Sequence, residues 1–585
     1  MKYIIGISAY YHDSAASLIT DSGEIICAVQ EERFSRVKHD SSFPKQSLKF
    51  FLSEFNLSPE DIEAIIFYEK PFLKFERLLE TYINFFPKGF LQFLKSMPIW
   101  VTQKLFQERD IRKNLNEIND NFKYKKIFFS DHHLSHAASA FFPSKFNKSA
   151  ILTADGVGEW CTTTISIGNE NNIKTVKEIH FPHSLGLLYS AFTFYCGFKV
   201  NDGEYKLMGL APYGKPIYEK IIKDKIVNIK EDGSFLLNLD YFEYATGFKM
   251  IGKKFENLFK MPARKKNKKI DNFYMDIAAS IQKVTEDIII KMSEMIKKNY
   301  NVENLCLAGG VALNCVCNGI LQKRGIFKNI WVQPAAGDAG GSLGAALSYI
   351  YIEKKRVRKY NNLSIDSMKG SLLGPQIKSD EIEKNLVRLG AKFLRVERIE
   401  LNKIVAKKIS EGKLFGWFQD RMEFGPRALG NRSIIADPRD PTMKKKLNMS
   451  IKFREGFRPF APAILEEKVF DWFDFNTKSP YMQFVAKVKR NKQSIPAVTH
   501  VDNSARLQTV SKETNPKFYH LIEEFYKITK VPILINTSFN INNEPIVNSI
   551  EDAYKCFLTT ELDFLVCGEY LIDKKDQFSS LIKNV

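Results

Sequence analysis

Three short β-rich runs within the first thirty residues constrain the fold of this chain more than any other feature. They cover residues 3–8, 15–20 and 25–30. The turn DSG, residues 21–23, joins the second run to the third, and Asp, Ser and Gly favour turns between paired strands. The pattern therefore predicts a three-stranded meander at the start of the chain.

Further segments with the character of strands and helices follow this meander. Apolar runs at 126–129, 150–154 and 304–308 are typical of buried strands, and apolar residues at spacings of three and four predict a helix over 271–298. A final helix is expected to begin near Ser342. An opening meander suits an α/β domain of the actin-like, ribonuclease-H-like ATPase (ASKHA) class. No internal sequence repeat is visible.

The length of 585 residues exceeds what one hydrophobic core fills, so we expect two large domains. We place the first at 1–360 and the second at 374–585. Two basic runs, 264–269 and 354–359, are interpreted as exposed, solvated loops. No stretch reaches the roughly 18 apolar residues that a membrane span needs, and the first residues lack a cleavage signal. A cytoplasmic protein is the expectation.

Residues 70–120 differ in composition from the rest of the first domain. Aromatic residues are interleaved there with lysine and arginine, mostly at helical spacing. We expect a helical insertion whose aromatic face packs on the core. A cap that binds a substrate or touches a membrane is the alternative.

The segment HHLSHAASAFF, residues 132–142, places three of the nine histidines within five positions. On a helix, His132 and His136 lie on one face, and imidazole is a ready ligand for iron, zinc and similar metals. A carboxylate must complete such a site, and Asp155 and Asp338 both stand at the start of glycine-containing turns. The alternative is that these histidines pack or cap a helix and that the aspartates cap turns.

Two glycine-rich segments lie about thirty residues apart. They are LAGGVALNCVCNG, residues 307–319, and GDAGGSLGAA, residues 337–346. Glycines let backbone amides approach phosphates, and a following helix adds the positive end of its dipole. Neither segment is a P-loop, but the pair favours a nucleotide-type site over a purely structural role.

The second domain carries a group of basic residues in loops rich in glycine and proline. They are Arg427, Arg432, Lys452, Arg454, Arg458 and Arg506. Guanidinium groups match phosphate oxygens bidentately, so the group resembles a polyphosphate cradle. Ordinary surface arginines of a basic protein are the alternative interpretation.

The net charge of +19 favours polyanionic partners, but the lysines are dispersed along the chain. Binding to nucleic acid is therefore a minority hypothesis. The eight cysteines form no C-x-x-C pair, so we expect reduced thiols and no structural zinc site.

Taken in order, the motifs of this chain resemble those of the NodU/CmcH family of carbamoyltransferases, which includes the nodulation-factor and tobramycin O-carbamoyltransferases. The segments that carry the resemblance are GISAYYHDSAA, HHLSHAA, GEYKLMGLAPYG, LAGGVALNC, GDAGGSLGAA, FGPRALGNRS, REGFRPFAPA and LINTSFN. The resemblance implies an actin-like N-terminal domain and an α/β, YrdC-like C-terminal domain. It also implies an enzyme that converts carbamoyl phosphate and ATP, supplied as Mg-ATP, to carbamoyladenylate and then carbamoylates a hydroxyl group.

The resemblance also assigns residues to these two reactions. Carried over by motif, Fe(II) or another divalent metal is expected on His132, His136 and Asp338, with Asp155 beside them. Gly309, Gly310 and Asn314 are expected to contact carbamoyladenylate together with Asp155. Carbamoyl phosphate and ATP are expected on Arg427, Lys452, Arg458, Arg506, Ser538 and Asn540, and the catalytic residues are expected to be His12, Asp155 and Arg458.

Several questions stay open at this stage. His12 is a candidate general base or an acceptor contact, and an ordinary turn histidine is the alternative. The acceptor is a hydroxyl-bearing small molecule or sugar of unknown identity, and a homodimer is one possible assembly. The alternative functions are tRNA modification or nucleic-acid binding, and a plain ATPase on the same fold. A hydrogenase-maturation role is excluded because its zinc-finger cysteines are missing.

Overall fold

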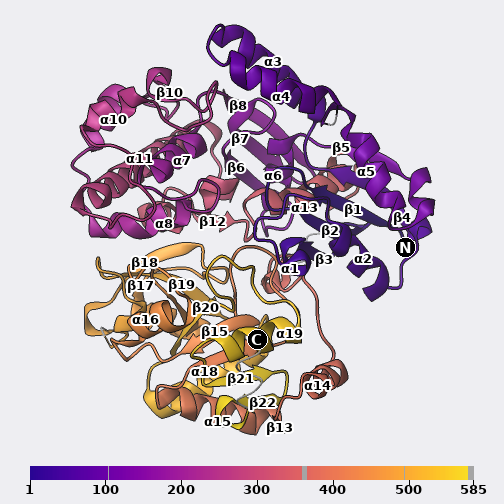
Figure 1. Ribbon diagram of the computed structural model, residues 1–585, viewed down its shortest axis with the longest axis vertical. Coiled ribbons are helices and arrows are strands. Elements are labelled where there is room, and N and C mark those ends of the chain that lie inside the picture. Colours follow the sequence, from indigo (N-terminus) through magenta and orange to yellow (C-terminus); the bar gives the residue numbers. More distant parts are fainter. Residues whose placement is uncertain (103, 359–364, 493, 578–585) are drawn as a thin grey trace. The chain divides into compact units, whose positions relative to one another are not determined.

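The computed structural model describes residues 1–102, 104–358, 365–492 and 494–577 (Figure 1). Contacts divide the chain into two compact units. Unit 1 comprises Met1–Glu31 and Asp40–Ser367, and unit 2 comprises Glu32–His39 and Met368–Val585. The end of the first domain expected at residue 360 lies outside the described residues, as does Lys359 of the second basic run.

The first sheet of unit 1 has five strands in the order β3-β2-β1-β4-β5. Its strands are β1 (Tyr3–Ser8), β2 (Ala15–Thr20), β3 (Ile25–Gln30), β4 (Ile62–Phe67) and β5 (Lys126–Phe129). The pairs β1–β2 and β2–β3 are antiparallel, whereas β1–β4 and β4–β5 are parallel. The predicted opening meander is confirmed.

The second sheet of unit 1 repeats this arrangement, with the order β12-β11-β6-β7-β8. Its strands are β6 (Lys148–Ala154), β7 (Cys161–Asn169), β8 (Asn172–His180), β11 (Asn304–Ala308) and β12 (Asn329–Val332). Again the first three strands along the chain, β6, β7 and β8, pair antiparallel. The last two, β11 and β12, run parallel to β6. Two copies of this topology make the actin-like fold, which confirms the expected class and shows a repeat of topology that the sequence does not display.

Two helices lie between the sheets of unit 1. Helix α6 (His132–Phe141) packs on β6 and β11, α13 (Asp338–Ser348) packs on β1 and β2, and the two helices pack on each other. Glycines allow this close approach: a Cβ added at Gly344 would lie 1.7 Å from the carbonyl oxygen of Ser135, and one at Gly6 would lie 1.8 Å from that of Ser342. The N-terminal ends of both helices therefore lie close together.

The insertion between β4 and β5 is helical, as expected, with α3 (Pro71–Phe85), α4 (Phe90–Thr102) and α5 (Gln107–Asn116). The expectation that its aromatic face packs on the core is wrong for much of the segment. Tyr82 and Trp100 are buried, but Phe72, Phe86 and Phe90 are exposed.

Unit 1 contains further helices, of which α2 (Lys45–Glu54) packs on the first sheet. The others are α7 (Leu185–Tyr195), α8 (Glu204–Leu210), α9 (Glu219–Ile221), α10 (Lys253–Phe259), α11 (Asn272–Tyr300) and α12 (Cys315–Arg324), beside a small sheet of β9 (Val227–Ile229) and β10 (Phe235–Leu237). The helix predicted over 271–298 is confirmed as α11. Among the described residues, no helix is both long and apolar enough to cross a membrane.

Two arginines of the predicted solvated runs are buried instead. Arg264 donates to the carbonyl of Cys196 at 2.7 Å, and Arg358 donates to those of Phe146 at 2.9 Å and Ser144 at 2.6 Å. Each guanidinium satisfies several carbonyls at once, which offsets the cost of burying its charge.

Unit 2 contains one mixed sheet of ten strands in the order β13-β22-β21-β14-β15-β20-β16-β19-β18-β17. The strands are β13 (Leu394–Arg395), β14 (Phe415–Phe418), β15 (Arg432–Ala436), β16 (Ala461–Leu465), β17 (Phe473–Asp474), β18 (Phe484–Val488), β19 (Ser504–Val510), β20 (Ile533–Ser538), β21 (Phe564–Cys567) and β22 (Tyr570–Asp573). Its helices are α14 (Ser379–Arg388), α15 (Arg398–Ser410), α16 (Met443–Lys446), α17 (Val469–Trp472), α18 (Pro516–Thr529) and α19 (Ile550–Thr559). The α/β class expected for this part is confirmed.

A short N-terminal segment, Glu32–His39 with helix α1 (Glu32–Ser35), belongs to unit 2. Arg33 donates to the carbonyl of Gly425 at 2.9 Å, and Arg36 donates to that of Ile546 at 2.7 Å. Arg36 also pairs with Asp552 at 3.3 Å. Unit 2 is therefore completed by a piece of chain that precedes it by more than three hundred residues.

Candidate functional site

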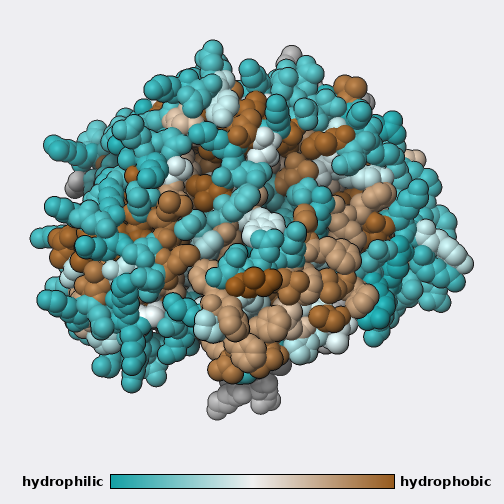
Figure 2. Space-filling view, turned by 90° about the horizontal axis from the view of Figure 1, so that it is seen from above, coloured by the Kyte–Doolittle hydropathy of each residue, from teal (hydrophilic) through white to brown (hydrophobic). Residues whose placement is uncertain are grey.

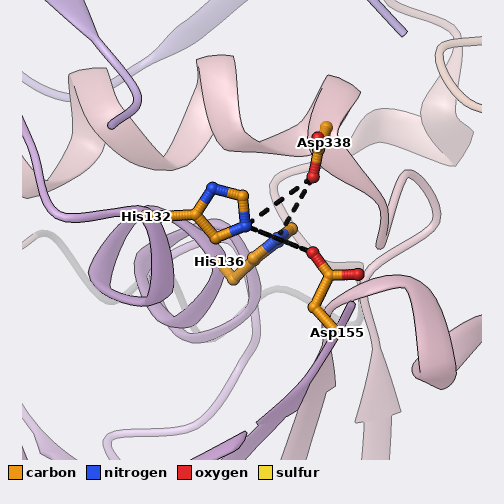
Figure 3. Close-up of side chains that lie close together, drawn as sticks. All are labelled: His132, His136, Asp155 and Asp338. Atoms are coloured by element: carbon orange, nitrogen blue, oxygen red, sulfur yellow. Dashed lines mark hydrogen bonds and ion pairs between the residues drawn. The ribbon is translucent and has the colours of Figure 1, made fainter. Parts of the chain in front are cut away.

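Two histidines and two aspartates from three separate segments meet in unit 1 (Figure 3). The Nε2 atoms of His132 and His136 lie 3.1 Å apart, and the Oδ2 atom of Asp155 lies 3.2 Å from each of them. The Oδ1 atom of Asp338 lies 3.8 Å from His132 Nε2 and 3.6 Å from His136 Nε2. We call these four residues the His/Asp cluster.

The position of each member follows from the fold. His132 and His136 are one helical turn apart near the start of α6, so both imidazoles point to the same side. Asp155 follows the last residue of β6, and Asp338 is the first residue of α13. All four residues are candidates from the sequence, and the structure brings them together.

His133, the third histidine of the motif, points elsewhere. Its Nδ1 lies 2.6 Å from the hydroxyl of Thr153 on β6. Burial, together with the neighbouring His132 and His136, holds its pKa well below the ordinary value, so His133 is neutral. The packing role considered for the histidines therefore applies to this one.

The glycine-rich turn after β11 orients Asp155. The backbone N–H of Gly310 donates to Asp155 Oδ1 at 3.1 Å, which leaves Oδ2 facing the histidines. Gly309 adopts φ of 85°, and a Cβ there would lie 2.3 Å from the carbonyl oxygen of Ala154. Asn314 caps α12 by accepting from the N–H of Cys317 at 3.0 Å. Gly309, Gly310 and Asn314 therefore each make a hydrogen bond inside the protein.

Charge is concentrated in the cluster. Burial opposes ionisation of Asp155, but hydrogen bonds from His132 and His136 hold its pKa well below the ordinary value. Burial likewise disfavours protonated His132, yet Asp155, Glu69 and Asp338 raise its pKa well above the ordinary value. Several carboxylates thus stabilise positive charge at this point, whether that charge is a proton or a bound cation.

The donor set fits a divalent metal ion. Bonds of about 2.1 Å from a metal to nitrogen or oxygen place neighbouring ligand atoms roughly 3 to 3.5 Å apart. Most separations in the His/Asp cluster fall in or just above that range. Asp155 Oδ2 is nearer to both histidines than Asp338 Oδ1 is, so the geometry offers both carboxylates as ligands.

Two buried glutamates near the cluster were not found from the sequence. Glu159 accepts from the backbone N–H of His132 at 3.0 Å and from that of Lys70 at 2.7 Å, so it holds the first turn of α6. Glu69 lies 3.7 Å from Nδ1 of His132 and pairs with Lys74 at 2.8 Å. Glu69 stands just beyond the end of β4, so the strand-end rule applied to Asp155 was the available signal.

His12 lies in the loop between β1 and β2, beside the cluster. Its Nε2 is 3.7 Å from Asp338 Oδ2, and its Nδ1 is 3.1 Å from Asp13 Oδ2. Burial alone would lower the pKa of His12, but the carboxylates of Asp338 and Asp13 raise it to about 9.

In unit 2, Lys452 is buried beneath the loop that follows β20. Its Nζ donates to Asn540 Oδ1 and to the Asn540 carbonyl, both at 2.9 Å, and it also contacts the hydroxyl and the carbonyl of Ser538. Burial, with Arg454 and Arg458 close by, holds the pKa of Lys452 well below the ordinary value. The structure therefore joins Lys452, Ser538 and Asn540 and places Arg458 near them.

Asn448 forms hydrogen bonds with both neighbouring arginines, Arg454 and Arg458. Its side-chain amide donates to the carbonyl of Arg458 at 3.0 Å, and its Oδ1 accepts from Nε of Arg454 at 2.7 Å. Arg458 also pairs with Glu455 at 3.5 Å. The loop 452–458 thus carries three basic side chains, Lys452, Arg454 and Arg458, close together.

Arg427 and Arg506 are partly exposed, and the strands β20 and β16 lie between β15 and β19 in the sheet. Arg427 belongs to the loop before β15, and Arg506 is on β19. Glu423 shapes the first of these loops, because its Oε1 accepts from the backbone N–H of Leu429 at 2.6 Å and from that of Asn431 at 2.8 Å.

Arg432 differs from the other arginines of the predicted cradle. It is completely buried, its guanidinium lies 3.6 Å from the centre of the Phe418 ring, and it donates to the carbonyls of Asn431 and Asp420. Both of its terminal nitrogens donate to backbone carbonyls inside the protein, so Arg432 holds the loop rather than a phosphate.

Comparison with known proteins places this site in a family. Residues 3–347 match the family model described as Carbamoyltransferase N-terminus, and residues 406–574 match the one described as Carbamoyltransferase C-terminus. An uncharacterised protein of Synechocystis sp. PCC 6803 is 50% identical over 605 residues, covering 99% of this chain and 97% of that protein. The nodulation protein NolNO of Sinorhizobium fredii is 38% identical over 578 residues, covering 97% and 80%.

Among known structures, component A of the (R)-2-hydroxyglutaryl-CoA dehydratase of Acidaminococcus fermentans is 18% identical, with a TM-score of 0.33. That match covers 61% of this chain and 99% of the other. The two family models together match most of the chain, in the order expected from the motifs. The chain therefore belongs to the carbamoyltransferase family and is a transferase enzyme.

Proposed function

We propose that this enzyme is an O-carbamoyltransferase that forms carbamoyladenylate from carbamoyl phosphate and ATP. It then transfers the carbamoyl group to a hydroxyl of a sugar, polysaccharide or natural-product acceptor. The observation that carries this proposal is the buried His/Asp cluster in the actin-like unit of a carbamoyltransferase-family chain. Such a cluster can hold a Lewis acid beside a reacting carbonyl group.

We assign activation to unit 2. Water releases phosphate from carbamoyl phosphate and leaves carbamate, whose oxygen attacks the α-phosphorus of ATP to give carbamoyladenylate and pyrophosphate. Arg427, Arg458 and Arg506 would bind the phosphate oxygens, because guanidinium groups stabilise the charge that develops there. Ser538 and Asn540 would supply neutral hydrogen bonds and keep Lys452 in place.

We assign delivery to unit 1. His132, His136, Asp155 and Asp338 would hold Fe(II) or another divalent cation, which supplies Lewis acidity toward the carbamoyl group when bound. Gly310 keeps Asp155 oriented, and Glu159 keeps the first turn of α6 in place. The acceptor oxygen attacks the carbamoyl carbon, the bond from that carbon to the AMP oxygen breaks, and the acceptor proton passes to a base.

His12 is the proposed base or acceptor contact. It lies beside Asp338, whose negative charge favours a proton on the imidazole. If Asp338 held a cation, the charge of its carboxylate would be offset, and the pKa of His12 would be lower, so that its neutral, proton-accepting form would be more available.

The nucleotide product tests the activation step. Purified full-length protein with carbamoyl phosphate and Mg-ATP is expected to release pyrophosphate and AMP, measured by a coupled pyrophosphate assay and chromatography. Arg458→Ala should lower the rate about 100-fold or more, in line with the loss of one donor that stabilises transferring charge. Arg490→Ala, in a short helical turn of the same unit, is the matched control and should keep the rate.

The opposite results are equally clear. Release of ADP without pyrophosphate would replace the proposal by a plain ATPase. An absence of pyrophosphate with every acceptor tried, from a protein that binds carbamoyl phosphate, would refute carbamoyladenylate formation.

A further inference from the structure

Helix α4 carries its large apolar side chains on the outward face, the reverse of an ordinary surface helix. Positions 90, 91, 94, 98 and 101 share one side of a helix of 3.6 residues per turn. Exposed fractions on this side are 51% for Phe90, 70% for Leu91, 51% for Leu94 and 49% for Val101. Lys95 is the one charged residue on the helix.

The inward face of α4 carries polar side chains that already have partners. Gln92 donates to the carbonyl of Gly247 at 3.0 Å, and Ser96 lies 3.0 Å from the hydroxyl of Tyr82. Trp100 is buried on the same side. The helix is therefore held firmly in this orientation, and its apolar face points outward.

The apolar face extends onto neighbouring segments. Ile83, Phe86, Phe106 and Phe248 are all more than half exposed. Figure 2 shows the molecule from the side on which Figure 1 places α3 and α4, and apolar side chains gather there in one region of a mostly polar surface. Monomeric soluble proteins rarely expose large contiguous apolar patches without an interaction partner.

The stretch of chain that carries this face has only positive charges. From Thr81 to Gln107 the sequence contains no Asp or Glu and three lysines, at positions 88, 95 and 104. Lys95 lies 5.0 Å from the ring centre of Phe248, and Lys104 lies 5.1 Å from that of Trp100, so both ammonium groups sit among the aromatic side chains. The acidic residues of α3, Glu76 and Glu80, precede this stretch.

We propose that the outward face of α4, with Phe86, Lys88 and Lys95, docks on an anionic lipid bilayer surface. Apolar side chains that enter the headgroup region, with lysines that meet anionic lipid, are the pattern of helices lying in the membrane interface. Helix α4 has 13 residues, too few for the roughly 20 that a spanning helix needs, so it lies on the bilayer. A second copy of the chain is a poorer occupant, because a two-fold contact would set lysines against lysines.

Vesicle sedimentation with the full-length protein tests the proposal independently of catalysis. The protein is expected to sediment together with vesicles of phosphatidylcholine that contain about 30% phosphatidylglycerol, an anionic lipid. Vesicles of phosphatidylcholine alone are expected to bind at least about tenfold less, and salt should weaken the anionic binding.

Two sets of variants separate the apolar and the charged contributions. Leu91→Glu with Leu94→Glu, and separately Lys88→Gln with Lys95→Gln, should each lower the partition coefficient about tenfold or more. The matched control is Val387→Glu with Ile399→Glu, two residues of unit 2 that are equally exposed, and it should bind like the wild type. All these side chains are at the surface, and thermal unfolding checks that each variant is folded.

Several outcomes would overturn the proposal. They are equal binding to both vesicle types, no binding to either, or loss of binding in the control as severe as in the α4 variants. A concentration-dependent dimer that Leu91→Glu with Leu94→Glu disrupts, without vesicle binding, would assign the face to a second copy instead. Because the readout is sedimentation, failure here leaves the proposed carbamoyl transfer untouched.

Discussion

Lys452 occupies an unusual setting for a lysine. Its ammonium group is buried, its hydrogen-bond partners are neutral oxygens, and two arginines lie nearby. A lowered pKa means that the folded protein disfavours the charged form until an anion arrives. Bound phosphate groups would restore the proton, which links this lysine to the proposed activation site.

Substitution of Lys452 by methionine separates binding chemistry from folding. Lys452→Met keeps the length of the side chain and removes a group that the folded state holds unfavourably as a cation. We expect a free energy of unfolding, measured in urea, within about 0.5 kcal/mol of the wild type or higher, but pyrophosphate release reduced about 100-fold or more. Lys445→Met, an exposed residue of α16, should change neither.

A large loss of stability in Lys452→Met with normal turnover would contradict this view. Lys452 would then be a structural residue, as Arg432 is.

His500 predicts a dependence of stability on pH. Burial lowers its pKa from 6.5 to about 4. The carboxylate of Asp502 opposes this shift only in part, and the positive charges of Arg506, Lys444 and Lys487 lower the pKa further. Its Nδ1 lies 3.0 Å from the hydroxyl of Ser504, and its Nε2 has no hydrogen-bond partner among the described residues. The folded protein therefore holds this imidazole neutral.

Because the unfolded chain binds the proton near pH 6.5 and the folded protein near pH 4, the contribution of His500 is complete above pH 6.5. It is lost as the pH falls toward 4. The wild type should lose about 1 to 3 kcal/mol of unfolding free energy through His500 between pH 7 and pH 4. In His500→Asn this loss should disappear. Urea unfolding at several pH values measures it, and His180→Asn, an exposed histidine, is the control. An unchanged slope would contradict the prediction.

At the scale of elements, the close packing of α6 and α13 decides whether the His/Asp cluster exists. Asp338 comes from one helix and both histidines come from the other. Their approach depends on Gly344, which faces the backbone of Ser135 without room for a Cβ. A methyl group at that point must push the helices apart.

Gly344→Ala is expected to lose about 3 kcal/mol or more of folding free energy, because backbone rather than a flexible side chain blocks the added methyl. Metal content, measured by elemental analysis after loading with Fe(II) or Zn²⁺, should fall with it. Gly337→Ala, one residue before α13 with no atom within 4 Å of the added Cβ, is the matched control. Full metal content and stability in Gly344→Ala would contradict this account of the helix pair.

At the scale of the whole molecule, the proposal divides two reactions between two compact units. His132→Ala is expected to keep pyrophosphate release and to lose carbamoyl transfer at least about 100-fold, whereas Lys452→Met should lose both. Carbamoyladenylate is a mixed anhydride that water destroys, so a closed site is needed to protect it.

A mixture of the two variants extends this test. His132→Ala can activate and Lys452→Met can deliver, but the intermediate must cross bulk water between separate molecules. We expect the mixture to transfer at least about tenfold more slowly than the wild type, measured by mass spectrometry of the carbamoylated acceptor. A mixture as active as the wild type would show that the intermediate is released freely into solution.

The sequence alone predicts the local parts of this structure well. Alternating apolar patterns and turn residues determine β1, β2 and β3, which have the predicted bounds, and periodicity determines α11. The four-residue spacing of His132 and His136 places both imidazoles on one helical face before any tertiary contact is known. These features depend on neighbours within a few positions.

Only the tertiary structure decides what distant segments do together. The topological repeat brings α6 and α13 into one layer, so that Asp155 and Asp338, 183 residues apart in the chain, face the same pair of histidines. Burial of Arg358 and Arg432 and the outward apolar face of α4 also depend on which surfaces pack. Charge and periodicity show that a residue is basic or a helix amphipathic, but not which side is covered, because that depends on contacts between parts far apart in the sequence.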